Sequence, residues 1–373
     1  MINQTFMVTR KQNMPLPVSN IQDLGDTSIR EISITDAEAW DAVIKGFEHY
    51  EPFYLHGYVK AFTEHSNGEP VLLVYEEDGV KAANVVVRRD IYDIEGFAEH
   101  LPPKTYYDLS TPYGYGGFIC DTGITEKIQQ EYNRYCLQQG YICEFVRFNL
   151  FSDYVHRYDG TTRSNMLNIV CDLSGSWDDV FARYQGKTRQ KVRKVQKNGW
   201  TVRVGNACED IESFLPIYYD TMDRNQAQNM YYFKHDFFAT LKNLGDKVQY
   251  FFAEKDGQVG AVNVLIAGAE NTYCFLSSTA REFLNESPNY LLMSEMIAWS
   301  HAQGFKNFVI GGGYGSNDEL LRFKKGFAPE GTYDFYIGSK IFNQEVYDAL
   351  VEIRKEAKPD FDTESAYFPL YRA

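Results

Sequence analysis

The sequence predicts an α/β (α+β) fold that consists of two tandem copies of one domain, each a mixed, mostly antiparallel sheet flanked by helices. The first observation is a repeated turn. Asp78-Gly79 and Asp256-Gly257 each separate two β-favouring runs, and Asp-Gly in that setting is a strong hairpin signal. The second observation is a repeated helix end, since Gln139-Gly140-Tyr141 and Gln303-Gly304-Phe305 both lead from a helix into a strand. Chance similarity of two hairpins is the alternative to a repeat.

The first copy opens with two short helices. Apolar residues at helical spacing between Ala39 and Phe47 predict the first helix, over 36–49, and the second covers 52–62. The remaining elements of this copy are predicted in the following order: strands over 71–75 and 82–88, a glycine- and tyrosine-rich loop within 106–120, a helix over 125–139 and a strand over 143–148.

The second copy follows a strand predicted over 166–173. Ser176 and Asp179 have the spacing of a capping box, which predicts the start of a helix. Ser287 before Pro288 predicts another helix start, because serine caps helices and proline fits their first turn. The remaining elements are a basic helix over 187–198, a strand over 200–204, helices over 210–224 and 234–244, strands over 248–254, 259–266 and 272–278, a polar loop over 279–286, a strand over 305–310, a glycine turn over 311–313, a basic segment over 320–327, a strand over 333–341 and a helix over 346–355.

These elements predict where the chain divides. We expect an irregular lead-in over 1–30, a first domain over 31–172, a second domain over 173–345, and a C-terminal helix with a tail over 346–373.

Composition narrows the class of protein. The chain has 373 residues and a net charge of −14, which argues against broad binding to nucleic acid or to a membrane surface. The first 20 residues lack the apolar core of a secretory signal, and no apolar run approaches the length of a membrane span. Six cysteines lie scattered without a CxxC pair, as in reduced, mostly buried thiols. We therefore expect a cytoplasmic protein without a membrane span.

Several common site motifs are missing from the sequence. Its seven histidines show no HxxxH spacing, so we expect no metal site. It has no Walker A lysine motif, no complete dinucleotide fingerprint and no GxSxG elbow. The oligomeric state is left open.

A candidate ligand site lies after the strand predicted over 305–310. Gly311, Gly312 and Gly313 allow a sharp turn and a close approach of a ligand to the backbone. Lys324 and Lys325 follow, and cations near a strand end suit an anionic or acyl-bearing ligand. Solvated charges on a short helix are the alternative interpretation of the two lysines.

At this point the sequence resembles a known fold. The order of hairpin, strand, loop, helix and strand over 248–310 resembles the core of the GNAT acetyltransferases, and the tandem copy resembles the Fem-type peptidyltransferases and their acetyltransferase-like relatives. Three segments are similar to motifs of that family: the basic helix with its glycine at 188–199, the glycine loop at 112–117, and Phe323-Lys324-Lys325-Gly326-Phe327. The resemblance covers roughly residues 35–340.

The resemblance implies transfer of an acyl group to an amine. The donor would be an acyl-coenzyme A such as acetyl-coenzyme A, and the acceptor an amino sugar or another precursor of the cell envelope. One alternative is a Fem-type peptidyltransferase that uses aminoacyl-tRNA, which the basic helix favours. The family's pyrophosphate loop is glycine-rich, whereas residues 279–287 contain no glycine. A non-catalytic binding module with a degenerate donor site is therefore a third hypothesis.

The resemblance also implies site residues. The predicted catalytic residues are Tyr314, Lys324 and Asp220, the last as a general base. The residues expected to bind the donor are Ser278, Asn285, Ser287, Asn289 and Lys325. The residues expected to bind the acceptor are Tyr113, Tyr115, Gly116, Arg193, Arg224 and Gly313. Ordinary packing is the alternative for the tyrosines, helix capping for the residues near 287, and a solvated face for the basic helix.

Overall fold

The structure is a computed structural model that describes residues 25–63, 68–205, 211–313 and 319–373. Tyr314, one of the predicted catalytic residues, lies outside them, as do residues 1–24 of the predicted lead-in.

The first part of the chain forms six strands and the helices between them. Its elements are β1 (Ile29–Ser33), α1 (Ala37–Ile44), the 3-10 helix η1 (Pro52–Tyr54), α2 (His56–Thr63), β2 (Glu69–Glu77), β3 (Val80–Asp90), β4 (Tyr107–Ser110), α3 (Glu126–Gln138), β5 (Tyr141–Arg147), η2 (Asp153–His156) and β6 (Thr161–Asp172).

The second part repeats the strand and helix order. Its elements are α4 (Trp177–Ala182), α5 (Gly186–Lys197), β7 (Thr201–Gly205), α6 (Ile211–Arg224), η3 (Asn229–Tyr231), α7 (His235–Leu241), η4 (Lys242–Lys247), β8 (Val248–Lys255), β9 (Gln258–Ala267), β10 (Asn271–Thr279), η5 (Arg281–Glu286), α8 (Asn289–Ala302), β11 (Asn307–Gly312), α9 (Glu319–Lys325), β12 (Thr332–Ile341), α10 (Gln344–Ala357) and η6 (Leu370–Arg372).

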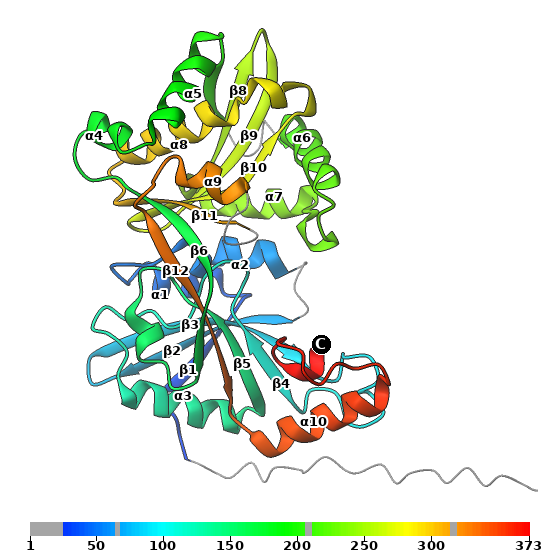
Figure 1. The fold of residues 1–373 in the computed structure, drawn as a ribbon. Coiled ribbons are helices and arrows are strands. Elements are labelled where there is room, and N and C mark those ends of the chain that lie inside the picture. The colour runs from blue at the N-terminus through cyan, green and yellow to red at the C-terminus, as the bar shows by residue number, and fades with distance from the viewer. Residues whose placement is uncertain (1–24, 64–67, 206–210, 314–318) are drawn as a thin grey trace, which may run out of the picture.

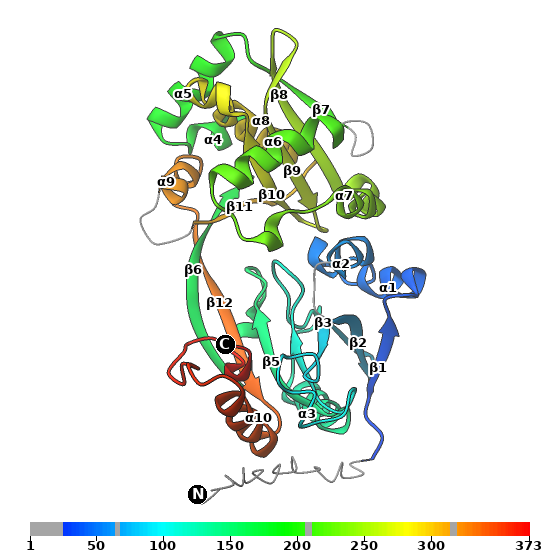
Figure 2. The same ribbon diagram turned by 90° about the vertical axis from the view of Figure 1, so that its right-hand side faces the viewer.

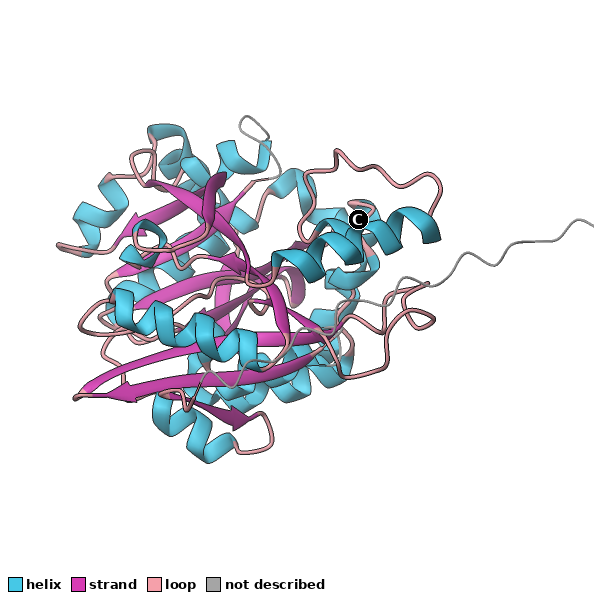
Figure 3. Ribbon diagram, turned by 90° about the horizontal axis from the view of Figure 1, so that it is seen from below, coloured by secondary structure: helices cyan, strands magenta, loops and turns pink. Residues whose placement is uncertain are grey.

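All these strands form one mixed sheet in the order β1-β2-β3-β4-β5-β12-β6-β11-β10-β9-β8-β7. The pairing in the two halves is the same. β2–β3 and β3–β4 are antiparallel and β4–β5 is parallel, while β8–β9 and β9–β10 are antiparallel and β10–β11 is parallel. Helices lie on both sides of the strands (Figure 3). The predicted fold class, with its tandem repeat, is confirmed.

The repeated turn has the same backbone geometry in both halves. Asp78 and Gly79 have φ of 52° and 77°, and Asp256 and Gly257 have the same two values. Positive φ at both central residues is the condition of a type I′ hairpin, which aspartate tolerates and glycine adopts freely. Local turn chemistry therefore built both hairpins as predicted.

Two strands cross between the halves. β6 pairs with β11 of the second half, and β12 pairs with β5 of the first half and with β6. Figures 1 and 2 show β6 and β12 running side by side through the narrow middle of the molecule. The division into domains at residue 172 stays a prediction, in which β6 and β12 are the strands that the two halves share.

A hydrophobic cluster also joins the halves. α2 of the first half packs against α7 of the second, and the buried residues of this cluster come from both, including Phe62 and Phe237, whose rings meet edge to face at 4.9 Å. Such aromatic contacts add stability beyond the area they bury. In the described part of the chain no helix combines the length and the apolar character needed to cross a membrane.

Three local predictions are corrected by the structure. Gly311 and Gly312 do not form a turn, because β11 continues past a bulge and pairs with Ile169 and Asn168 of β6. Ser287 does not cap α8, because it ends η5 in a left-handed conformation with φ of 58°. The lead-in becomes regular at Ile29, where β1 pairs with β2. The capping box of Ser176 and Asp179 is confirmed.

Candidate functional site

The central feature of the candidate site is a split between two parallel strands of the second half. β10 and β11 pair from Asn271–Asn307 to Tyr273–Val309 and then part, although β10 continues to Thr279 and β11 to Gly312. A bulge lies between Cys274 and Leu276 on β10 and another between Val309 and Gly311 on β11. Bulges bend strands, so both strands turn away from their shared edge at this point. Beyond Tyr273, the backbone of β10 has no strand partner on the β11 side among the described residues, so a ligand can reach it there.

Lys324 stands at this split. Its Nζ donates to the carbonyl oxygen of Gly312 at 2.6 Å, and a Cβ on Gly311 would lie 3.3 Å from the same Nζ. Gly311 has φ of 90°, which side chains rarely adopt. On the opposite strand, burial raises the pKa of the Cys274 thiol to about 11, and the Lys324 ammonium acts to lower it. The described residues thus place the Lys324 ammonium beside Gly311, Gly312 and the neutral Cys274 thiol at the split.

A polar contact from the first half reaches the same place. Tyr115 Oη donates to Asn168 Oδ1 at 2.8 Å, and Asn168 lies beside Gly311 and Gly312 on the neighbouring strand β6. Burial raises the pKa of the Tyr115 hydroxyl above its ordinary value, so that it stays a hydrogen-bond donor. The structure therefore brings together Tyr115 and Lys324, two of the predicted site residues that are distant in sequence.

Asp220 and Arg224 lie at a second point, where α6 meets the end of β10. Arg224 donates to Asp220 at 2.8 Å and to the carbonyl oxygen of Thr279 at 3.2 Å, and Arg281 donates to the other Asp220 oxygen at 3.0 Å. Both carboxylate oxygens are engaged by guanidinium groups. The contacts favour a positioning function for Asp220, in which it holds Arg224 at the strand end, over proton abstraction.

The predicted donor loop is folded into η5 and tied to its neighbours. Glu286 accepts from the Trp200 indole at 2.9 Å and from Lys255 at 2.7 Å. Asn289 donates to Ser277 Oγ at 2.8 Å, Ser278 is buried on β10 with a hydroxyl that has no partner among the described residues, and Asn285 is exposed. A coenzyme A pyrophosphate is normally held by free N–H groups of a glycine-rich loop at a helix start. The residues present here do not form such a loop.

The first half has a split of its own. β4 and β5 pair as far as Ser110–Phe145, and β5 continues to Arg147. Gly116, a predicted acceptor residue, donates from its backbone N–H to the Arg147 carbonyl at 2.6 Å, where a Cβ would lie only 2.7 Å from Thr111. A pocket of about 210 Å³ opens beside this split, and Tyr113 is in its wall.

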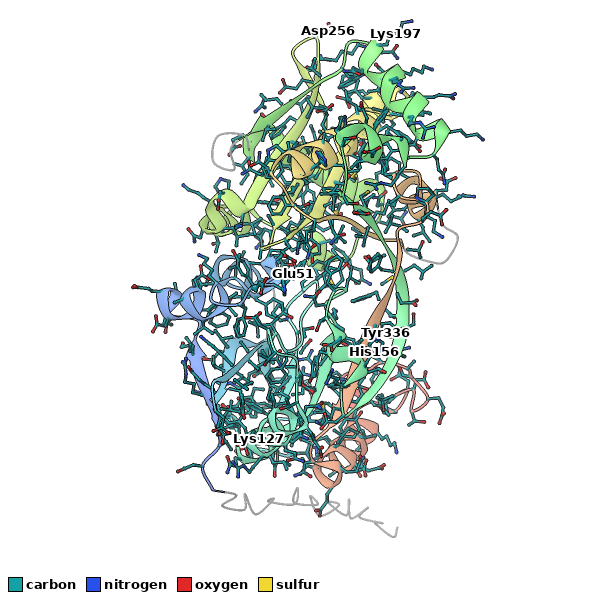
Figure 4. The ribbon with its side chains drawn as sticks, turned by 90° about the vertical axis from the view of Figure 1, so that its left-hand side faces the viewer. Glu51, Lys127, His156, Lys197, Asp256 and Tyr336 are labelled. Atoms are coloured by element: carbon teal, nitrogen blue, oxygen red, sulfur yellow. The ribbon has the colours of Figure 1, made fainter. Side chains whose placement is uncertain are left out.

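Among the described residues, no contact joins Arg193 to either split. It is exposed on α5 with its guanidinium 5.3 Å from the centre of the Phe181 ring. Figure 4 shows Lys197, at the end of the same helix, near Asp256 at the outer end of the second half, and Glu51 far away between the halves. The exposed cations of α5 are Lys187, Lys191, Arg193, Lys194 and Lys197. None of them has a carboxylate within 4.0 Å in the described residues.

Sequence reasoning missed three residues near these sites, of which Asn168 and Glu51 are buried and Arg147 is half-buried. Arg147 was predicted only as part of a strand, and Asn168 likewise. Glu51 had no predicted function; its Oε1 accepts from Asn271 Nδ2 at 2.6 Å, across the boundary between the halves, and burial raises its pKa to about 8. The only signal in the sequence was the charge of Arg147 in a mostly apolar strand. The described residues contain no group of three or more His, Cys, Asp or Glu side chains that could hold a metal ion.

Comparison with known proteins agrees with this geometry. Residues 182–325 match the family model described as acetyltransferase (GNAT) domain. The chain is similar to a UDP-N-acetylmuramoylpentapeptide-lysine N(6)-alanyltransferase of Weissella viridescens, at 24% identity over 194 residues. This match spans 50% of the chain and 56% of that relative.

Two solved structures share the fold. The crystal structure of FemX has a TM-score of 0.66 at 14% identity, and the match covers 86% of this chain and 99% of that one. The C-terminal domain of a putative lysylphosphatidylglycerol synthetase from Agrobacterium fabrum has a TM-score of 0.54 at 9% identity, covering 85% and 96%. The resemblance to GNAT and Fem-type proteins predicted from the sequence is confirmed.

Proposed function

We propose that this chain is a Fem-type N-acyltransferase, which moves an aminoacyl group from an aminoacyl-tRNA to an amine of a cell-envelope precursor in the cytoplasm. The observation that carries the proposal is the split between β10 and β11 with Lys324 at its edge. The similarity to an alanyltransferase that acts on a lysine of a muramoyl pentapeptide supports the substrate class.

The reaction at the split is aminolysis of an ester. The neutral amine attacks the carbonyl carbon, a C–N bond forms, and the C–O bond to the ribose breaks while the amine proton passes to the leaving hydroxyl. The carbonyl oxygen gains negative charge on the way, and groups that stabilise this charge lower the barrier. The groups in place to do so are the Lys324 ammonium and the backbone of β10 beyond Tyr273, which has no partner on the β11 side among the described residues.

Two features favour the aminoacyl donor over acyl-coenzyme A. The 279–287 segment does not offer the usual pyrophosphate loop, since it contains no glycine and residues 281–286 form η5, which Glu286 ties to Trp200 and Lys255. The five exposed cations of α5 suit a phosphate backbone, although the chain as a whole is acidic. The match of residues 182–325 to the GNAT model keeps acyl-coenzyme A as the second candidate donor.

A transfer assay separates these candidates. Purified full-length protein is incubated with the UDP-linked muramoyl pentapeptide and either bulk tRNA charged with radiolabelled amino acids or labelled acetyl-coenzyme A. We expect label to reach the peptide from charged tRNA, and Lys324→Met to lower the rate by roughly a hundredfold. Transfer from acetyl-coenzyme A instead would select the second donor. Absence of transfer from both would contradict the proposal and favour the non-catalytic module.

A further inference from the structure

We infer that the first half carries a second ligand site, at its own strand split, where Arg147 binds a small anion with an apolar body. The anionic group is a carboxylate or a phosphate. The inference rests on the proposed function in one respect only, which is that we identify the ligand as the anionic end of the amine acceptor.

The internal repeat shows that the two splits occupy equivalent positions. They differ in the residue that supplies the positive charge. The last β4–β5 pair is Ser110–Phe145, and Arg147 lies two residues beyond it on β5. The last β10–β11 pair is Tyr273–Val309, and Gly311 lies two residues beyond it on β11. Where the second half has a glycine and brings in Lys324 from α9, the first half has an arginine on the strand itself. A cation therefore lies beside each split, Arg147 in the first half and Lys324 in the second.

Arg147 has no carboxylate partner within 4.0 Å among the described residues. Its guanidinium contacts neutral oxygens, Ser110 Oγ at 3.5 Å and the Thr111 carbonyl at 3.4 Å, and lies 5.0 Å from the centre of the Phe145 ring. Burial lowers the pKa of Arg147, but guanidinium groups remain charged at neutral pH. A half-buried cation without a counter-charge is a costly arrangement that an anionic ligand would relieve.

The neighbouring charges do not supply that anion. Arg89, which lines the same pocket, donates to Asp108 at 2.5 Å, and Arg372 donates to the other Asp108 oxygen at 2.6 Å. Asp108 is fully buried between these two guanidinium groups. The single carboxylate of Asp108 thus pairs with two arginines. It does not neutralise the positive charge that Arg147 adds to the pocket.

The rest of the pocket is apolar and is built by both halves. Phe62 stacks on Tyr113 with ring centres 5.3 Å apart, and Met230 and Phe233 close the pocket from the second half. The volume of about 210 Å³ suits a small group. A planar guanidinium at one end and aromatic walls at the other select an amphiphilic carboxylate or phosphate.

One loop connects this pocket with the split between β10 and β11, where we propose that transfer occurs. Tyr113 lines the pocket, and Tyr115, two residues later, bonds Asn168 beside Gly311. An acceptor whose anionic end is held by Arg147 would be fixed relative to the split that holds Lys324. The pocket would then set which amine is presented for transfer.

Calorimetric titration of the full chain tests this site. The probes are phenyl phosphate, N-acetylphenylalanine and, as the neutral match, N-acetylphenylalaninamide. We expect at least one anionic probe to bind, the amide not to bind, and Arg147→Gln to weaken binding about tenfold or more. Arg147→Lys should give an intermediate loss of affinity, because lysine keeps the positive charge but lacks the two parallel N–H donors of the guanidinium. Arg163→Gln, on an exposed arginine of β6, is the matched control and should bind as the parent does.

The outcomes separate this inference from the proposed function. Which of the two anionic probes binds identifies the acidic group. No binding of either up to about 10 mM, or equal binding by the Arg147→Gln variant with an unchanged melting temperature, would overturn the site even if the transfer assay succeeds. Binding that depends on Arg147 without any transfer would retain the site and remove the proposed reaction.

Discussion

At the scale of single residues, the buried carboxylates of Asp108 and Glu51 have opposite surroundings. Asp108 lies between two guanidinium groups, whereas Glu51 meets an amide and no cation among the described residues. Burial therefore favours the protonated form of Glu51 and raises its pKa from 4.5 to about 8. Glu51 joins the two halves through Asn271, so its protonation state affects the stability of the contact between them.

This difference predicts a pH dependence of stability. Between about pH 5 and pH 8 the folded state keeps the Glu51 proton and the unfolded state does not, so rising pH removes stability over that range. We expect Glu51→Gln to flatten this slope by roughly 1 kcal/mol per pH unit and to exceed the parent in stability above pH 8. Urea unfolding of both proteins from pH 5 to 9 measures the difference. Parallel curves would show that Glu51 is ionised in the folded state.

A second prediction concerns Gly311. Its φ of 90° strains any side chain, and a Cβ would press on Lys324 Nζ at 3.3 Å. Gly311→Ala should cost about 1 kcal/mol of stability and also reduce transfer. Gly304→Ala is the control, because Gly304 has φ of 84° but no atom within 4 Å of the added Cβ. Thermal melts and transfer rates of both variants are compared. Equal rates in the two would separate Gly311 from the function of Lys324.

At the scale of elements, the two hairpins and the two strand splits differ in how far the sequence predicts them. The hairpins were predictable because Asp-Gly turns depend on adjacent residues only. The splits were not, since where β4 ends relative to β5 depends on pairing across the sheet. The charge of Arg147 in a mostly apolar strand therefore did not indicate that the strand ends nearby, whereas Lys324 was predicted from a local motif. Asp220 was predicted as a base without knowledge that Arg281 would approach it.

The basic helix provides a test at this scale. If tRNA binds across α5, replacing Lys194 and Lys197 by glutamine should reduce the slope of log affinity against log salt by about two, one for each lost phosphate contact. Filter binding of bulk tRNA between low and moderate salt measures the slope. Lys104→Gln with Lys242→Gln, two exposed lysines elsewhere, is the control. An unchanged slope would place the tRNA on another surface.

At the scale of the whole molecule, the exchanged strands make the halves interdependent. β5 obtains its outer neighbour from β12, and β11 obtains its neighbour from β6. Fragments 1–199 and 200–373, divided at the turn after α5, should therefore be insoluble or aggregated when expressed alone and should co-purify as a complex when expressed together. Size-exclusion chromatography checks this. Two soluble, monomeric, cooperatively melting fragments would contradict it.

The same exchange imposes an order on folding during synthesis. The edge of β5 is complete only after the ribosome has made every strand from β6 to β12, because its partner is β12. Chains emerge amino terminus first, and unpaired strand edges invite aggregation. The nascent first half must wait with an open sheet edge until the second half has been translated, so a chaperone that covers β5 would be needed most in that interval.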